Sequence, residues 1–350
     1  MGGGGGGRQG GMWARTLKHM MRRHAYMSPP YLAVGLAVGA TAICGSACMW
    51  TSCHKATSPS GYNRSTVASD GMVGRSYASS SSGEAQQASS KTMRFAAGAS
   101  MLPHPDKEHR GGEDAYFIHS SEYCLGVADG VGGWAEVGVD PGLYSRELMN
   151  HSVSLLDALD SEIGIHSGTP QDVLEGAHAK TKARGSCTAC ILCLFEGRVH
   201  AANLGDSGFL IARQGVVEYV SPQQQHEFNF PYQIGSPDSM SDLPSAANRH
   251  VVDVQHGDVL VAATDGLFDN VFPDEAAAIV GMSKEKGHSP KEAADLLAKF
   301  ARTRAADPKH LSPFAYGAQQ LGYRYLGGKM DDITVVVAYI QEDEEEKNAE

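Results

Sequence analysis

Acidic residues stand at the ends of short apolar runs, and this arrangement could hold divalent cations. Two acidic positions follow such runs and two precede them: Asp129 after 123–128, Asp265 after 259–264, Glu113-Asp114 before 115–118, and Asp331-Asp332 before 333–340. A carboxylate at the mouth of a buried strand is costly to desolvate and repels its neighbours. Several gathered together are explained by a strongly positive group among them. Mg²⁺ and Mn²⁺ prefer such oxygen-only sites.

The same residues predict a hydrolytic centre. Asp-Gly is a common turn dipeptide, so one instance alone indicates little. Asp129-Gly130 and Asp265-Gly266 each follow a fully apolar run, however, which places the carboxylate on a rigid support. A pair of cations there would need a bridging carboxylate and a water whose pKa is lowered between them. Such a water attacks a phosphoryl group in line, without a covalent enzyme intermediate.

Five motifs carry a resemblance to a known enzyme family. In chain order they are Gly112-Glu113-Asp114-Ala115-Tyr116, Val127-Ala128-Asp129-Gly130-Val131-Gly132-Gly133-Trp134, Asn203-Leu204-Gly205-Asp206-Ser207, Thr264-Asp265-Gly266-Leu267-Phe268-Asp269 and Asp331-Asp332-Ile333-Thr334-Val335-Val336-Val337. In this order, over residues 95–340, they resemble the metal-dependent type 2C (PPM) Ser/Thr protein phosphatases. The stretch 226–233 is similar to the branch of that family found in mitochondria and plastids.

The resemblance implies a role for each matching position. Two Mg²⁺ or Mn²⁺ ions would be held by Asp129 as the bridge, the backbone carbonyl of Gly130, Asp265, Asp331 and Glu113. Asp114 would orient metal-bound water, so Asp129 and Asp114 are the implied catalytic residues. A third, weaker cation would be held by Asp206 and Asp269. The implied fold is a pair of packed antiparallel sheets with helices outside, and the implied substrates are phosphoproteins.

Two positions depart from the family pattern. Many members have His directly after the first Asp-Gly, as general acid for the leaving alcohol, and here that position is Val131. Many also have Arg four residues before Glu113 to bind phosphate. Here His109 stands there with Arg110 beside it, and these two are the implied phosphate-binding residues. A missing general acid would cost roughly 10²–10⁴-fold on a poor leaving group. His226 is a candidate substitute, and a surface histidine is the alternative.

Strand patterns dominate the rest of residues 95–340, with helices in pairs. Short apolar runs between Gly, Asp or Asn turns predict strands at 115–118, 123–128, 187–195, 198–203, 208–212, 216–220, 251–254, 259–263 and 333–340. Helical patterns cover 142–160, 170–182, 273–281 and 289–305, with N-terminal capping signals at Thr169 and Ser289. Clustered strands with paired helices predict an α+β fold, an α-β-β-α sandwich of two packed antiparallel sheets flanked by helix pairs.

One connection is too long for an ordinary loop. Residues 221–250 contain four prolines and the aromatic run Phe228-Asn229-Phe230-Pro231-Tyr232. Loops of this length in compact domains are functional or disordered. The aromatic residues favour an ordered lid or a partner surface over a flexible tether.

The charge distribution divides the chain into a basic leader and an acidic body. Residues 1–94 hold ten Lys or Arg and only Asp70 and Glu84, about +8, which leaves about −19 for 95–350. We expect a basic targeting segment over 1–50, a Ser/Gly-rich linker over 51–94, the phosphatase domain over 95–340 and an acidic tail over 341–350. The acidic body argues against nucleic-acid binding, which needs a basic footprint. The chain is expected to be a monomer.

The leader predicts an organelle, mitochondrion or plastid. Its basic, acid-free and later Ser-rich composition is typical of a transit peptide. Residues 31–50 carry no charge over about the length that spans a bilayer, so a membrane anchor and a signal peptide remain alternatives.

Three other interpretations compete for particular motifs. Cys187, Cys190 and Cys193 are spaced like metal ligands, but no second cluster completes them, so a half-buried strand with free, buried thiols is favoured. Gly205-Asp206-Ser207-Gly208 is similar to the nucleophile motif of trypsin-like proteases, but no matching His context lies upstream. A weakly active or non-catalytic type 2C-like scaffold is the alternative function.

Overall fold

The structure, a computed structural model, describes residues 92–162 and 168–342. The expected leader, its apolar stretch 31–50 and nearly all of the linker lie outside the described residues. Strands extend the folded body two residues beyond each predicted boundary, because β1 spans Met93–Leu102 and β14 spans Ile333–Glu342. No helix among the described residues is long and apolar enough to cross a bilayer.

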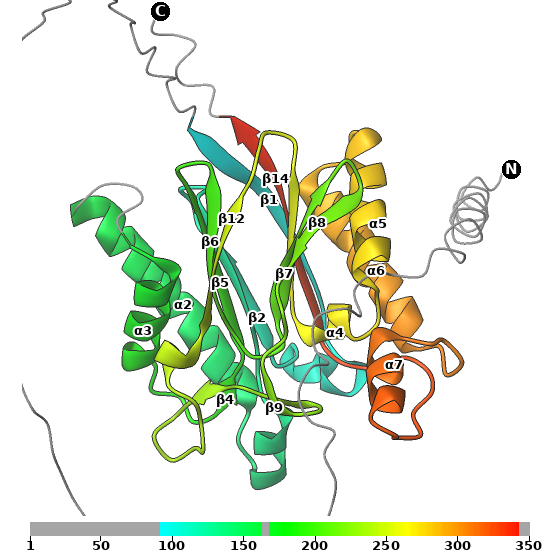
Figure 1. Ribbon diagram of the computed structural model, residues 1–350. Coiled ribbons are helices and arrows are strands. Elements are labelled where there is room, and N and C mark those ends of the chain that lie inside the picture. The colour runs from blue at the N-terminus through cyan, green and yellow to red at the C-terminus, as the bar shows by residue number, and fades with distance from the viewer. Residues whose placement is uncertain (1–91, 163–167, 343–350) are drawn as a thin grey trace, which may run out of the picture. The chain divides into compact units, whose positions relative to one another are not determined.

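Two five-stranded antiparallel sheets form the centre of the molecule (Figure 1). The first sheet has the order β1-β14-β13-β7-β8, in which β13 spans Val259–Ala263, β7 spans Gly208–Arg213 and β8 spans Val216–Val220. The second has the order β12-β6-β5-β3-β2, with bounds Asn248–Asp253, Arg198–Leu204, Ala189–Phe195, Cys124–Asp129 and Asp114–Ile118. The predicted pair of antiparallel sheets is confirmed.

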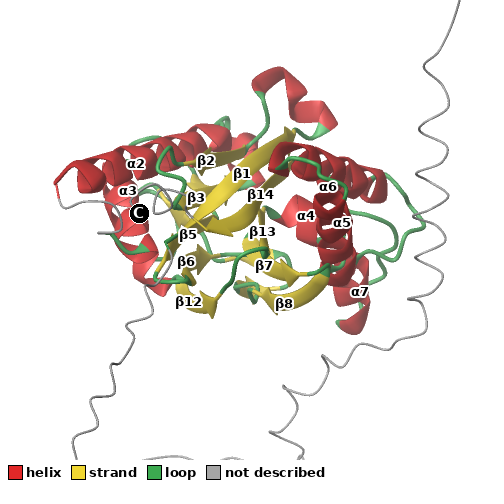
Figure 2. Ribbon diagram, turned by 90° about the horizontal axis from the view of Figure 1, so that it is seen from above, coloured by secondary structure: helices red, strands yellow, loops and turns green. Residues whose placement is uncertain are grey.

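Helix pairs cover the outer face of each sheet (Figure 2). Helices α2 (Pro141–Glu162) and α3 (Pro170–Lys180) lie against the second sheet, and α5 (Pro273–Glu285) and α6 (Pro290–Ala305) lie against the first. Capping boxes start α3 at Thr169 and α6 at Ser289, as predicted. Of the two shorter helices, α4 (Asp265–Phe268) contacts β13 and β14, and α7 (Pro313–Gln320) lies below α6 in the view of Figure 1.

Three buried apolar clusters hold these four layers together. One lies between the second sheet and α2–α3, one between the first sheet and α5–α6, and one between the two sheets. The cysteines of β5 and its neighbour β4 (Ser186–Cys187) follow this division: Cys187 and Cys193 face the helices, whereas Cys190 faces the other sheet. The thiols are free and buried, as predicted. The predicted half-buried strand is wrong, because helices and a second sheet cover both faces of β5.

The long connection is folded rather than open. It contains β9 (Gln225–Glu227), β10 (Phe230–Pro231), β11 (Ile234–Gly235) and the short 3₁₀ helix η3 (Pro244–Ala246). Strand β11 pairs with β4 in a separate two-stranded sheet, and β4 lies directly before β5 of the second sheet in the chain. Two further 3₁₀ helices, η1 (Pro105–Arg110) and η2 (Gly132–Val137), flank the acidic motifs.

Candidate metal centre

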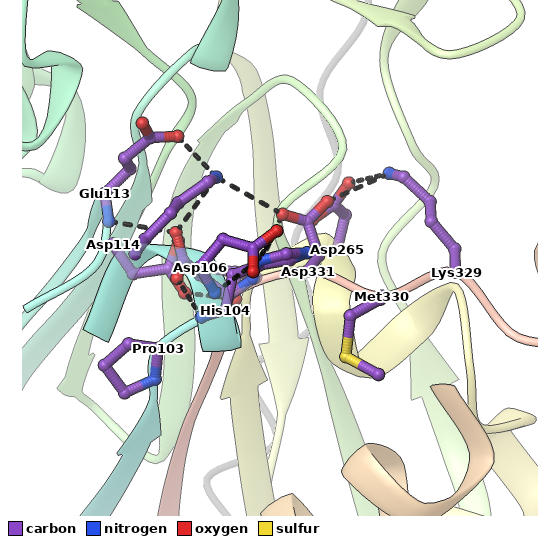
Figure 3. A network of polar contacts seen from close by, with 12 residues as sticks. Pro103, His104, Asp106, Glu113, Asp114, Asp265, Lys329, Met330 and Asp331 are labelled. Carbon is purple, nitrogen blue, oxygen red and sulfur yellow. Dashed lines mark hydrogen bonds and ion pairs between the residues drawn. The ribbon is translucent and has the colours of Figure 1, made fainter. Parts of the chain in front are cut away.

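Sheet register brings the predicted carboxylates to one end of the sandwich. Asp114 and Asp129 are register partners on the antiparallel strands β2 and β3. In the other sheet, β13 runs antiparallel to β14, so Asp265 after β13 and Asp331 before β14 lie at the same end. Figure 3 shows Glu113, Asp114, Asp265 and Asp331 in one group.

The side chains of Thr264 and Asp332 each form a hydrogen bond that joins the two sheets at this point. The Thr264 hydroxyl donates to Asp114 Oδ2 at 2.9 Å and accepts from the backbone N–H of Thr334 at 3.0 Å. The buried Asp332 carboxylate accepts from the backbone N–H of Glu113 at 2.9 Å. These bonds fix the positions of Glu113 and Asp114 relative to the opposite sheet. Thr264 and Asp332 stand in two of the sequence motifs, but the sequence predicted no role for either residue.

The turn of α4 places two more carboxylates. Asp265 is its first residue, and Asp269 follows its end, with the Asp269 N–H donating to the Asp265 carbonyl at 2.7 Å. Gly266 between them is required by space, since a Cβ there would lie 1.9 Å from the Asp332 carbonyl oxygen. Close packing of this turn against the start of β14 therefore holds Asp265 beside Asp331.

Two lysines that the sequence analysis did not single out lie among the carboxylates. Lys107 Nζ lies 2.5 Å from Glu113 Oε2 and 3.4 Å from Asp332 Oδ2. Lys329 Nζ lies 2.6 Å from Asp265 Oδ2 and 2.8 Å from Asp269 Oδ2. Each lysine offsets part of the negative charge that burial would otherwise make costly.

Burial and mutual repulsion shift the titration of the cluster. Burial raises the pKa of Asp129 well above its ordinary value, and the charges of Asp114 and Asp265 raise it further. Burial and Asp332 do the same for the pKa of Asp114. Burial opposes ionisation of Asp265, but the Lys329 ammonium outweighs it and lowers the pKa. These carboxylates need positive charge to ionise together.

The residues present fit divalent cations. Asp114 Oδ1 and Asp265 Oδ1 are buried and have no hydrogen-bond partner. All the side-chain atoms that would bind the ions are carboxylate oxygens, which Mg²⁺ and Mn²⁺ prefer as ligands. Within residues 92–162 and 168–342, no three acidic, His or Cys side chains already converge enough to hold an ion. The ammonium groups of Lys107 and Lys329 contact these carboxylates instead.

Asp206 reaches the cluster from the loop between β6 and β7. It is 4% exposed, and its Oδ2 accepts a hydrogen bond from Gln225 Nε2 of the long connection at 3.1 Å. Burial, followed by the charge of Asp265, raises the pKa of Asp206 to about 7. The long connection therefore contacts the candidate metal centre directly.

The residues implied for phosphate binding and for proton transfer lie nearer the surface than the buried carboxylates. Arg110 Nη2 lies 2.6 Å from Glu113 Oε1, while the His109 side chain is exposed on η1. His226 is 39% exposed, pairs with Asp242 at 3.1 Å and stacks on Tyr232. These partners agree with a structural histidine on the surface of the connection.

Comparisons with known proteins agree with this geometry. Probable protein phosphatase 2C 80 of Arabidopsis thaliana is 53% identical over 250 residues, 71% of this chain and 59% of that protein. The protein phosphatase PTC7 homolog of Xenopus laevis is 40% identical over 247 residues, 66% of this chain and 82% of that protein. The X-ray structure of the photosystem II phosphatase PBCP matches with a TM-score of 0.64 and 37% identity, covering 70% of this chain and 98% of that one.

No protein-family model matches the chain. The chain nevertheless covers most of the length of the Xenopus laevis relative at 40% identity and nearly all of the solved phosphatase at 37%. With the two packed sheets and the carboxylate cluster, these matches lead to one conclusion: the chain belongs to the protein phosphatase 2C family.

Proposed function

We propose that this chain is a metal-dependent protein Ser/Thr phosphatase. The observation that carries the proposal is the meeting of Glu113, Asp114, Asp129, Asp265 and Asp331 at one end of the sandwich. The five come from four separate parts of the chain. Every implied side-chain ligand is Asp or Glu, which favours catalysis over the scaffold alternative.

Each carboxylate has a role in this proposal. Asp129, Glu113, Asp265 and Asp331, with the carbonyl of Gly130, would hold two Mg²⁺ or Mn²⁺ ions. When bound, these ions supply Lewis acidity and neutralise the phosphoryl oxygens. Thr264 holds Asp114 through Oδ2, which leaves the buried Oδ1 free of protein partners. That oxygen can orient the attacking water and accept its proton.

Phosphoserine and phosphothreonine proteins are the proposed substrates. Arg110, beside Glu113, is the proposed phosphate-binding residue, with His109 exposed next to it on η1. Val131 supplies no proton to a leaving alkoxide, so hydrolysis of an alkyl phosphate depends on solvent or on another acid. An aryl leaving group needs less protonation, because its oxygen is a weaker base.

The proposed location is an organelle, with the leader over 1–50 as the targeting signal and a membrane anchor at 31–50 as the alternative. The solved relative is described as a photosystem II phosphatase, which supports a plastid. Fusion of residues 1–94 to a fluorescent protein tests this proposal. Fluorescence in plastids would support it, and fluorescence spread through the cytosol would contradict it.

The activity is tested by metal-dependent hydrolysis. The full chain is assayed on a phosphothreonine peptide and on an aryl phosphate, with Mn²⁺, with Mg²⁺ and with a chelator. We expect turnover of both substrates with metal and none with chelator. Turnover of neither substrate by the folded protein would favour the scaffold alternative.

A further inference from the structure

Two of the buried cysteines lie in direct contact. Cys124 begins β3 and Cys193 lies near the end of β5, and these strands are neighbours in the second sheet (Figure 2). Their Sγ atoms are 2.7 Å apart, so no other atom lies between them. Both side chains belong to the apolar cluster between this sheet and α2–α3. The proposed function uses neither residue.

The backbone at this pair suits a covalent bond between the sulfur atoms. Cys124 and Cys193 are register partners on antiparallel strands. The Cys124 carbonyl accepts from the His119 N–H, on the side of β3 that faces β2. The hydrogen bond between β3 and β5 beside the pair runs from the Leu194 N–H to the Tyr123 carbonyl. The two cysteines therefore form a non-hydrogen-bonded pair, in which opposite Cα atoms lie about 4.5 Å apart. Disulfides join Cα atoms about 4.4–6.8 Å apart, so this pair can be bridged while the strands stay in register.

No other two thiols in the described part of the chain are arranged in this way. Its four cysteines are all buried. Cys190 faces the other sheet, whereas Cys187 pairs with Ile234 of the separate strand β11. Neither has a cysteine as its register partner in the described sheets. A disulfide within the folded body would therefore join Cys124 to Cys193.

Cys124 is the thiol that an oxidant reaches first. It is 8% exposed, against 2% for Cys193, and it directly follows the turn 119–123 between β2 and β3, in which Ser120 is exposed. This turn lies at the end of β3 opposite to Asp129. The contact with Cys124, followed by burial, raises the pKa of Cys193 well above its ordinary value, so Cys193 stays protonated. Because both thiols are buried, a small and uncharged oxidant that enters when the turn opens locally is the one that fits.

We propose that Cys124 and Cys193 form a modification site at which hydrogen peroxide produces a disulfide. The Cys124 sulfur attacks one peroxide oxygen, the O–O bond breaks, and the other oxygen leaves as water with the thiol proton. This step leaves a sulfenic acid on Cys124. The Cys193 sulfur then attacks the Cys124 sulfur, the S–O bond breaks, and the hydroxyl group leaves as a second water with the Cys193 proton. The two thiols together lose two electrons, and one peroxide is reduced to two waters.

The disulfide closes the chain between Cys124 and Cys193 into a loop. This loop carries α2, α3 and the Asp129-Gly130 motif. A cross-link over so long a segment restricts the unfolded chain and thereby stabilises the folded one. Oxidation is therefore expected to raise the Tm by several degrees, and a thiol reductant is expected to reverse the rise.

Peptide mapping of the full chain after peroxide treatment tests the proposal. The folded chain is treated with millimolar hydrogen peroxide in chelator, its remaining thiols are alkylated, and it is digested with trypsin. The tryptic peptide 111–146 contains Cys124 as its single cysteine, and 185–198 contains the other three described cysteines. Chymotrypsin, which cleaves after Leu192, then separates Cys193 from the other two. We expect mass spectrometry to find Cys124 linked to the fragment that begins at Cys193, and to lose this linkage after reduction.

Two variants sharpen the test. Cys193→Ala should lose both the linkage and the rise in Tm. Cys190→Ala is the matched control and should keep both, because Cys190 lies on the same strand and is also buried but faces the other sheet. A linkage from Cys124 to Cys187 or Cys190 would overturn the proposal. Recovery of Cys124 without any linkage, as the alkylated thiol or as a sulfinic acid, would overturn it too. If Cys193→Ala does not fold, the map of the unmodified chain still decides, and none of these outcomes bears on the phosphatase assignment.

Discussion

The buried carboxylates determine how the metal-free chain responds to pH. Burial, with the charge of Asp265, raises the pKa of Asp206 to about 7. Burial raises the pKa of Asp269 to about 8, with Asp265 adding to the shift and Lys329 opposing it. In the unfolded chain both groups titrate near their ordinary value of about 3.9. The folded chain therefore binds more protons between about pH 4 and pH 8, and its stability falls as pH rises through that range.

The raised pKa values of Asp206 and Asp269 predict a pH-dependent Tm in the presence of chelator. We expect the Tm at pH 8 to be several degrees below that at pH 5.5, and Mn²⁺ to restore it at pH 8. The Asp206→Asn variant should lose part of the slope, since one titrating group is gone. A Tm that rises from pH 5.5 to pH 8 in chelator would contradict the assignment.

Thr264 predicts a second residue-scale effect. Its hydroxyl holds Asp114 and accepts from Thr334, so Thr264→Val leaves a buried carboxylate oxygen and a buried N–H without partners. We expect a loss of about 1–3 kcal/mol in the free energy of unfolding. Urea denaturation in chelator measures it. Thr303→Val is the control, because the exposed Thr303 hydroxyl only donates to a carbonyl in its own helix. An equal loss of stability in that variant would contradict the role given to the Thr264 hydrogen bonds.

The positions of the carboxylates could be predicted from the residue types, whereas the contacts of the two lysines depend on the folded geometry. Asp129 and Asp265 follow apolar runs, so their place at strand ends could be inferred directly. Lys329 stands two residues before the Asp331-Asp332 motif, but nothing in this spacing indicated that Asn270 would tie its backbone to the turn that carries Asp265. Lys107 reaches Glu113 only because η1 folds back over it.

At the scale of elements, the junction of α4 with the start of β14 controls the site. A Cβ on Gly266 would meet the Asp332 carbonyl at 1.9 Å, too close to be relieved without moving backbone. Gly266→Ala is therefore expected to lower the free energy of unfolding by about 1–3 kcal/mol or more. Gly133→Ala in η2 is the control, since a Cβ there meets nothing within 4 Å. Thermal unfolding of the two variants checks this, and equal values of Tm would contradict it.

Element prediction succeeded where the local signal was strong. The dipeptides Glu196-Gly197 and Gln214-Gly215, each between two predicted strands, have positive φ at both residues, as type I′ hairpin turns require. Strand β1 was missed because its sequence is rich in Ala, Gly and Ser and shows little alternation. The reason lies in packing against α6: a Cβ on Gly98 would lie 2.4 Å from the backbone nitrogen of Lys291. The small residues of β1 allow α6 to approach closely, and the local sequence pattern does not reveal this contact.

At the scale of the molecule, the described residues form three apolar clusters. All three apolar clusters are made by residues 93–340, including the one that joins the two sheets. We therefore expect residues 92–350 to fold without the leader, with a Tm within a few degrees of that of the full chain. Circular dichroism during heating compares the two. Loss of cooperative unfolding in the shortened chain would show that residues 1–91 contribute to the fold.

The central claim is that the carboxylate cluster carries out metal-dependent phosphoester hydrolysis. The most direct measurement compares kcat on a phosphothreonine peptide, in Mn²⁺, for the unmodified chain, Asp129→Asn and the control Asp295→Asn, which changes a partly exposed carboxylate on α6. We predict that Asp129→Asn lowers kcat by at least about 10²-fold, as expected when transition-state charge stabilisation is lost. Asp295→Asn should retain full activity. An Asp129→Asn protein that is folded and as active as the unmodified chain would contradict the account.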